Sequence, residues 1–140
     1  GTSLRALMTA ELNQLYGESP SNVSIEGEDI HLTSEQTEAL GLCIHEMATN
    51  ALKYGAGTMP GGQIAIRWDL DGQMLHLVWD EATTAPVARP AKPGFGTRLM
   101  ESCVQGTLNG TLGREFRTHG LTIRISFPLQ SVSQVFLPQM

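Results

Sequence analysis

The sequence predicts an α/β domain in which helices and strands follow one another along the chain. Apolar residues recur every three or four positions in three segments, which is typical of helices. In other segments apolar and polar residues alternate on either side of turn dipeptides such as Asp71-Gly72, which is typical of antiparallel strands. The chain has 140 residues, of which 41% are hydrophobic, so one domain can bury a sizeable core.

The first third of the chain is expected to contain a helix, a weak strand and the start of a second helix. Leucines and a methionine recur at helical spacing after Ser3, a suitable N-cap, and this first helix should end near Tyr16. Segment 23–32 is a poorer strand candidate, because a glycine-containing turn lies inside it. Thr33, followed three residues later by Gln36, resembles a capping box, so a long helix is expected to start there.

The rest of the chain alternates strands with one more helix. Glycines after Tyr54 end the long helix, and a segment with three prolines and no periodicity indicates a mobile loop. The expected elements are strands 63–70 and 74–79, a loop over 84–93, a helix over about 97–107, and two strands that follow Asn109-Gly110 and His119-Gly120, the second over 121–127.

Charge and composition exclude several classes of function. The net charge is −5 and nine basic residues are scattered along the chain, whereas binding to a nucleic-acid backbone needs clustered Lys and Arg. No apolar run approaches the roughly 18 residues of a membrane span, so we expect a soluble, cytoplasmic domain without direct membrane contact. Cys43 and Cys103 lie in apolar helical patterns without CxxC spacing, which favours buried thiols in a reducing compartment.

Three polar side chains lie on one face of the long helix. Glu46, Asn50 and Lys53 are four and then three residues apart, so at about 100° per residue they fall within a narrow arc. An acceptor, a neutral oxygen ligand and a cation then point into one space. This combination suits a phosphate with its Mg²⁺, because Mg²⁺ takes oxygen ligands and is usually held by few protein groups plus phosphate oxygens.

An ordinary solvated helix face is the alternative interpretation of these three residues, because many surface helices carry polar groups at such spacings. The neighbouring residues favour the functional interpretation, since they make the helix apolar around most of its circumference and polar groups on a buried helix need partners. These neighbours are Leu40, Leu42, Cys43, Ile44, Met47, Ala48, Ala51 and Leu52.

Two further groups of residues fall where predicted elements join. Trp79-Asp80-Glu81 ends a strand just before the proline-containing loop, although a strand that simply runs out into solvent would look the same. The segment 94–99 places a glycine pair at the start of a helix, where glycines allow close backbone approach and free N–H groups favour phosphate oxygens. The order of these features along the chain is more specific than any one of them.

With these motifs in this order, the chain resembles the catalytic, ATP-binding domain of sensor histidine kinases. These kinases belong to the superfamily of gyrase, Hsp90, histidine kinase and MutL ATPases. The resemblance covers about residues 4–128. The N box of that superfamily reads Glu-x-x-x-Asn-x-x-Lys-aromatic and is matched by Glu46, Asn50, Lys53 and Tyr54. Its second glycine box is matched by Gly94, Gly96 and Leu99.

More narrowly, the chain looks like the HWE subfamily of these bacterial kinases. The subfamily has a His before the N-box Glu and a Trp-x-Glu in place of the usual Asp-containing box, which His45, Trp79 and Glu81 match. His45 and Trp79 either contact the nucleotide or pack within the core, and both options stay open. The segment 82–86, Ala-Thr-Thr-Ala-Pro, departs from the Ser-Gly-Gly-Pro that usually follows this Glu.

The resemblance implies a two-layer α/β sandwich of the Bergerat type, with a mixed, mostly antiparallel sheet covered on one face by helices. Residues 1–130 would form this domain and residues 131–140 a C-terminal tail. Asn50 would bind Mg²⁺, Glu46 would be the catalytic group that orients or activates the acceptor, and Glu81 would accept the adenine amino group. The other implied ATP-binding residues are His45, Lys53, Tyr54, Gly94, Phe95, Gly96, Thr97, Leu99 and Thr122, with 83–93 as the lid.

The implied function is that of an enzyme, a protein-histidine kinase represented by its catalytic domain. With ATP and Mg²⁺ as cofactors, it would deliver the γ-phosphoryl group to a histidine on a separate dimerisation and phosphoacceptor domain, from which a response-regulator receiver domain takes it. None of the four histidines of the chain lies in the sequence context that a phosphoacceptor histidine has in that family. The alternative is a degenerate docking module of a phosphorelay that no longer binds nucleotide, which the altered segment 82–86 favours and the intact Asn50 and Lys53 oppose.

Overall fold

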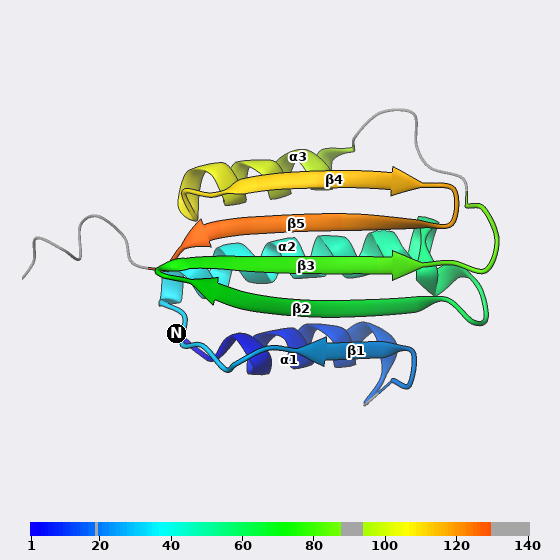
Figure 1. The fold of residues 1–140 in the computed structure, drawn as a ribbon, viewed down its shortest axis with the longest axis horizontal. Helices are drawn as coiled ribbons and strands as arrows, with labels where there is room; N and C mark the ends of the chain where they lie inside the picture. The colour runs from blue at the N-terminus through cyan, green and yellow to red at the C-terminus, as the bar shows by residue number, and fades with distance from the viewer. Residues whose placement is uncertain (19, 88–93, 130–140) are drawn as a thin grey trace, which may run out of the picture.

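Three helices cover one face of a five-stranded sheet in the computed structural model, which describes residues 1–18, 20–87 and 94–129 (Figure 1). The strand order is β1-β2-β3-β5-β4, with β1 parallel to β2 and every other pair antiparallel. The elements are α1 (Leu4–Tyr16), β1 (Val23–Glu26), α2 (Ser34–Tyr54), a 3₁₀ turn η1 (Ala56–Thr58), β2 (Gln63–Asp71), β3 (Met74–Ala82), α3 (Phe95–Ser102), a π-helical turn η2 (Cys103–Thr107), β4 (Thr111–Arg117) and β5 (Gly120–Pro128).

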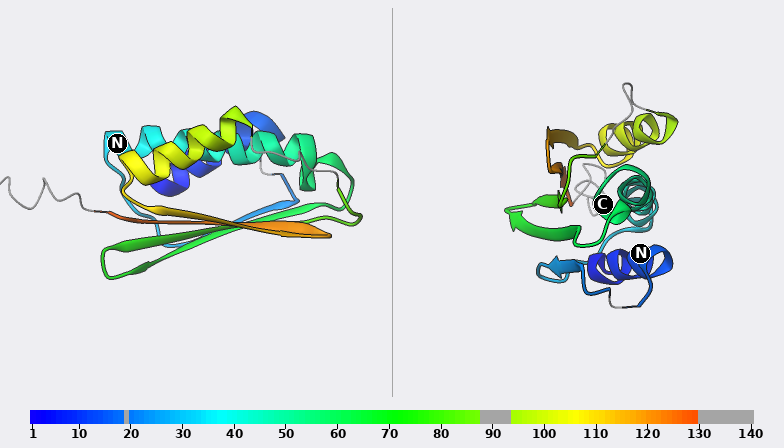
Figure 2. Two further views of the ribbon diagram at one scale, coloured as in Figure 1. Left: turned by 90° about the horizontal axis from the view of Figure 1, so that it is seen from above. Right: turned by 90° about the vertical axis from the view of Figure 1, so that its right-hand side faces the viewer.

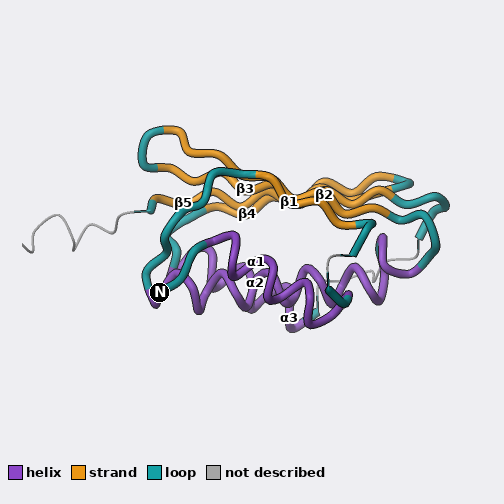
Figure 3. The backbone as a smooth tube through the Cα atoms, turned by 90° about the horizontal axis from the view of Figure 1, so that it is seen from below, coloured by secondary structure: helices purple, strands orange, loops and turns teal. Residues whose placement is uncertain are grey.

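The helices form a layer of their own, separate from the sheet (Figures 2 and 3). They lie in the order α1, α2, α3 from the β1 edge to the β4 edge, so that α2 runs over the middle of the sheet. The predicted two-layer α/β architecture with a mixed, mostly antiparallel sheet is therefore confirmed. Residues 88–93 of the predicted lid and the predicted tail 131–140 lie outside the described residues.

The start of α2 is fixed by the capping box that the sequence predicts. The Thr33 hydroxyl accepts a hydrogen bond from the Gln36 backbone N–H (3.1 Å), and the Gln36 side chain accepts one from the Thr33 N–H (3.0 Å). This reciprocal pair satisfies two N–H groups that a helix start otherwise leaves unpaired. The helix then continues for 21 residues and ends at Gly55.

Several elements differ from their predicted bounds, and β3 continues past the predicted residue 79 to Ala82. Strand β1 stops at Glu26 because Gly27 adopts φ 154°, and the Trp68 indole lies where a side chain at Gly27 would start. The Trp68 indole N–H donates to the Glu28 carbonyl at 2.7 Å, which turns the chain away from the sheet. Helix α3 starts at Phe95, two residues before the predicted Thr97, because Gly94 takes the extended N-cap conformation.

Alternate residues of β3 face the helices and end in a carboxylate. Leu75, Leu77 and Trp79 are buried against the helix layer, and Glu81 is the next residue of the same row. A carboxylate in this position is expensive to bury unless it has hydrogen-bond partners. The buried row of β3 therefore ends in Glu81, whose carboxylate belongs to the candidate site described below.

Both cysteines are free, as the sequence predicts, with Cys43 buried and Cys103 partly buried. Burial, with a smaller contribution from Cys103, raises the pKa of the Cys43 thiol to about 12, so this thiol stays protonated at neutral pH. None of the helices formed by the described residues combines the length and apolar character needed to cross a bilayer.

Candidate functional site

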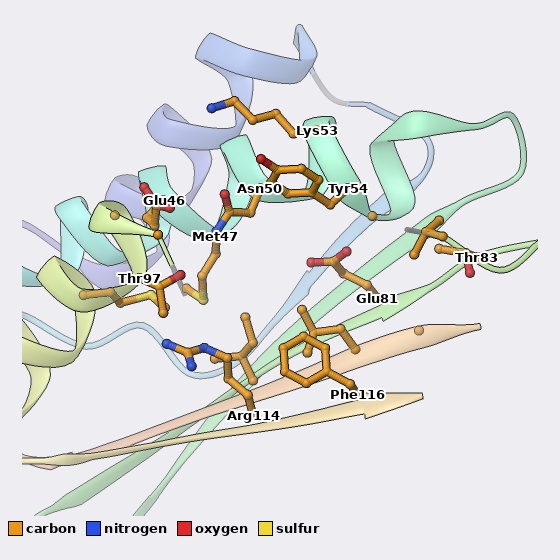
Figure 4. Close-up of a pocket in the computed structure, with 18 of the residues that line it drawn as sticks. Glu46, Met47, Asn50, Lys53, Tyr54, Glu81, Thr83, Thr97, Arg114 and Phe116 are labelled. Carbon is orange, nitrogen blue, oxygen red and sulfur yellow. The ribbon is translucent and has the colours of Figure 1, made fainter. Parts of the chain in front are cut away.

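A cavity of about 640 Å³ opens between α2, α3 and the sheet (Figure 4). Its volume is in the range of small-molecule sites, roughly 300–1,000 Å³. Nine of the predicted site residues line it: Glu46, Asn50, Lys53, Tyr54, Glu81, Gly94, Phe95, Gly96 and Thr97. The N-box helix, the strand-end carboxylate and the glycine-opened helix therefore do meet at one place.

Three predicted site residues do not line the cavity. Thr122 pairs with Asp80 across β3 and β5, and its hydroxyl donates to the Asp80 carboxylate at 2.8 Å while accepting from Arg117 at 2.6 Å. This register puts Thr122 on the sheet face away from the helices, so the structure does not place it with the predicted site residues that line the cavity. His45 is 51% exposed and lies 3.5 Å from Glu11, and Leu99 is exposed on α3.

The Glu81 carboxylate is held in a fixed position at one end of the cavity. It is 2% exposed, and it accepts hydrogen bonds from the Trp79 indole N–H (2.9 Å) and from the Ala56 backbone N–H (3.1 Å). A side chain at Gly55 would overlap one carboxylate oxygen, so glycine is required where α2 ends beside Glu81. Trp79 is fully buried, so it belongs to the core and orients the carboxylate.

Trp79 and Glu81 can meet because residues two apart in a strand point to the same face. The Trp-x-Glu spacing therefore has a direct physical reason in this chain. The negative charge of Glu81 also reaches α1, where burial and then this charge raise the pKa of Tyr16 to about 12. Tyr16 stays protonated and its hydroxyl donates to the Ala48 carbonyl (2.9 Å), which fastens α1 to α2 beside the cavity.

The opposite end of the cavity is formed where α3 approaches α2. The Glu46 carboxylate packs directly against Gly96, and a side chain at residue 96 would overlap it. Gly94, by contrast, has open space around its Cα atom. Gly96 thus allows the two helices to come together, whereas Gly94 leaves the backbone at the start of α3 accessible from the cavity.

The cations at the cavity are Lys53 and Arg114, as far as its described lining residues go. Lys53 is exposed, and its ammonium group points away from Glu81 and out of the cavity (Figure 4). Arg114 reaches from β4 toward Thr97 (Figure 4). Its Nη2 atom is buried, has no hydrogen bond to any of the residues that the structure describes, and lies 3.7 Å from the Glu101 carboxylate on α3. Arg114 is therefore better placed than Lys53 to contact an anionic group bound in the cavity.

Sequence reasoning missed Arg114, and it assigned Thr83 only to the predicted lid 83–93. Arg114 lies between Leu112 and Phe116 in the row of β4 that faces the helices, and a cation in such a row is an available signal. Thr83 lies in segment 82–86, where the sequence departs from the subfamily pattern. The other lining residues that the motifs did not predict are largely apolar: Met47, Val87, Met100, Phe116, Leu121 and Ile123.

The cavity therefore has three chemically different parts. A buried acceptor, Glu81, lies at one end, and apolar side chains form the middle. Glu46, Asn50 and Arg114 supply oxygen ligands and a cation at the other end. Such a site suits a flat, partly apolar ring that carries a hydrogen-bond donor and is joined to an anionic group.

Comparison with known proteins identifies the family to which the chain is similar. The family model for the histidine kinase-like ATPase domain matches residues 18–126. The chain is 33% identical over 127 residues to blue-light-activated histidine kinase 1 of Erythrobacter litoralis, a match that covers 88% of this chain and 35% of that protein. The chain thus spans about a third of the length of this curated relative.

Two solved structures share the fold. The histidine kinase domain of the blue-light-activated kinase EL346 from Erythrobacter litoralis superposes with a TM-score of 0.69 at 21% identity, over 86% of this chain and 57% of that one. Histidine kinase ThkA in complex with the response regulator TrrA superposes with a TM-score of 0.68 at 16% identity, over 92% and 42%. Since the family model covers most of the chain and the fold agrees, this chain belongs to the histidine kinase-like ATPase domain family.

Proposed function

We propose that this domain binds Mg-ATP as the catalytic domain of a sensor histidine kinase of the HWE subfamily. Its task would be to deliver the γ-phosphoryl group to a histidine on a separate dimerisation and phosphoacceptor domain. The observation that carries the proposal is one cavity with a buried acceptor at one end and oxygen ligands with a cation at the other, in a chain of this ATPase family. The hydrogen bond from Trp79 to Glu81 supports the subfamily assignment.

Glu81 is proposed to select the base. A carboxylate has about four acceptor positions, so Glu81 is able to accept a hydrogen bond from a ligand in addition to those from Trp79 and Ala56. Adenine presents an amino donor on its six-membered ring, whereas guanine presents a carbonyl oxygen there. A carboxylate facing that carbonyl would be repelled and unpaired, so the site should reject GTP.

We expect ATP to bind the wild-type domain about 10- to 100-fold more tightly than GTP, since a hydrogen bond to a charged group contributes about 1.5–3 kcal/mol. Replacing Glu81 by alanine should remove most of this difference. Isothermal titration calorimetry with Mg²⁺ and each nucleotide measures both values. Circular dichroism must first show that Glu81→Ala folds, because Trp79 and Ala56 lose their acceptor. Equal affinities of the wild-type domain for ATP and GTP would refute the role of Glu81.

The residues at the other end are proposed to hold the phosphates, the metal ion and the acceptor. Bound Mg-ATP would supply the phosphoryl group, and catalysis of its transfer rests mostly on positioning and charge. The Asn50 amide oxygen is a suitable Mg²⁺ ligand, and the buried Nη2 of Arg114, which has no hydrogen bond, suits a phosphate oxygen. Glu46, one turn before Asn50, would orient the acceptor imidazole.

The phosphoacceptor is proposed to lie outside this domain, with a response regulator as the later partner. Support comes from the likeness to ThkA, which has been solved with the response regulator TrrA. Incubated alone with γ-labelled ATP, the domain should stay unlabelled, and it should label a matching dimerisation domain when that domain is added. Glu46→Gln should slow this transfer while leaving ATP affinity within about twofold. The reason is that Glu46 is proposed to contact the acceptor imidazole rather than ATP, and that glutamine has nearly the same volume as glutamate.

Acid-labile label on the isolated domain would contradict the proposed separation of catalytic and acceptor domains. Absence of ATP binding at millimolar concentration would contradict the function as a whole. The degenerate docking module would then describe this chain better.

A further inference from the structure

A buried hydroxyl group without a hydrogen-bond partner lies at the Glu81 end of the cavity. Thr83 is 8% exposed and lines the cavity, and its Oγ1 atom has no hydrogen-bond partner among the described residues. Figure 4 shows Thr83 on the Glu81 side of the cavity, opposite to Glu46 and Thr97. Buried hydroxyl groups are nearly always paired, because an unpaired one has lost its water without compensation.

The position of Thr83 is fixed by its backbone. Its N–H donates to the His119 carbonyl at 2.9 Å, directly after the end of β3. The next residue offers an internal comparison, since Thr84 is exposed and its hydroxyl lies 3.4 Å from the Pro60 carbonyl, outside the cavity. Two adjacent threonines thus differ in surroundings, and the buried one is the one without a partner.

We propose that the Thr83 hydroxyl donates a hydrogen bond to the N1 atom of the adenine ring and so contributes to adenine recognition together with Glu81. This inference rests on the proposed function. Adenine presents a donor, the amino group, next to an acceptor, N1. The Glu81 carboxylate can only accept, whereas a hydroxyl can donate, so the two side chains together match this edge. In the structure the Thr83 Oγ1 atom is itself buried, so donation to N1 requires rotation about the Cα–Cβ bond to another staggered rotamer that turns the hydroxyl toward the cavity.

Discrimination against guanine rests on Glu81, because guanine presents an acceptor carbonyl where the carboxylate needs a donor. The Thr83 hydroxyl can accept as well as donate, so its contribution is measured by removing the N1 acceptor of adenine rather than by comparison with guanine. Thr122 cannot provide this hydroxyl, because it is engaged with Asp80 and Arg117 on the other face of the sheet. Thr83 therefore fills the role that the sequence resemblance gives to Thr122.

The test replaces Thr83 by valine, which keeps the shape and removes the hydroxyl. Calorimetry compares ATP with 1-deaza-ATP, in which a C–H group replaces N1. The wild-type domain should prefer ATP by about 10-fold, the effect of one buried hydrogen bond. Thr83→Val should weaken ATP binding by about the same factor and abolish the preference, whereas Thr83→Ser should keep it. Thr84→Val is the matched control and should bind both nucleotides as the wild type does.

Thermal unfolding of the unliganded variants supplies a second readout. Thr83→Val removes an unpaired buried hydroxyl, so its melting temperature should equal or exceed that of the wild type while its ATP affinity falls. A purely structural role would lower both together and would weaken ATP and 1-deaza-ATP equally, which overturns the inference. Unchanged ATP affinity in Thr83→Val also overturns it but leaves the proposed function standing. Failure of the wild-type domain to bind ATP would overturn both.

Discussion

Replacing Asn50 by alanine should remove the Mg²⁺ dependence of ATP binding. Asn50 lines the cavity one helical turn after Glu46, and its amide oxygen is the neutral ligand of the N-box face. Mg²⁺ bound by few protein groups depends strongly on each of them. We expect the affinity for Mg-ATP to fall by about 10- to 100-fold, to the value that the wild-type domain shows for ATP in the presence of EDTA.

The fold should survive this change, because alanine is a good helix former and Asn50 is only partly buried. Thr49→Ala is the matched control on the same helix, since the Thr49 hydroxyl bonds to backbone carbonyls of α2 and does not line the cavity. Asn50→Asp keeps an oxygen ligand and should retain the Mg²⁺ dependence. Calorimetry with and without Mg²⁺ measures the ATP affinity of the wild-type domain and of each variant. An unchanged affinity of Asn50→Ala for Mg-ATP would remove Asn50 from the metal site.

The parts of the fold that depend on local sequence signals could be predicted. The capping box of Thr33 and Gln36 sets the start of α2, and the Asp71-Gly72 turn joins β2 to β3, with Gly72 at φ 64°. The early end of β1 could not be predicted, because it depends on the Trp68 indole packing over Gly27. Sequence signals for turns and caps act over a few residues, whereas that contact joins residues about 40 positions apart.

The same distinction applies to the site. Glu46 and Asn50 share one helix face, and Trp79 and Glu81 share one strand face, so their spacing alone brings each pair together. The face on which Thr122 lies could not be read from the sequence, because it depends on the register of β5 against β3, where a shift of one residue reverses every side chain. Arg114 belongs to no motif. Its place at the site depends on the packing of the edge strand β4 against the helix layer beside α3.

Arg114 carries the second large prediction. Arg114 lines the cavity, one nitrogen of its guanidinium group is buried without a hydrogen bond to the described part of the chain, and the ion pair to Glu101 is long at 3.7 Å. Phosphate oxygens are strong acceptors for such a group. Arg114→Met, which keeps much of the apolar volume, should therefore lower ATP affinity by about 10- to 100-fold. Adenosine, which has no phosphate, should bind the variant as it binds the wild type.

Two further variants separate this role from a general loss of charge or packing. Arg124→Met removes a cation from the other face of the sheet, where Arg124 pairs with Glu115 at 3.3 Å, and should leave ATP binding unchanged. Glu101→Gln removes the carboxylate that competes for Arg114, so ATP affinity should stay equal or rise. Calorimetry with ATP, ADP and adenosine should show a loss that grows with the number of phosphates in Arg114→Met. Equal losses for ATP and adenosine would instead mean that Arg114 supports the cavity wall, and Lys53 would then have to reorient to meet the phosphates.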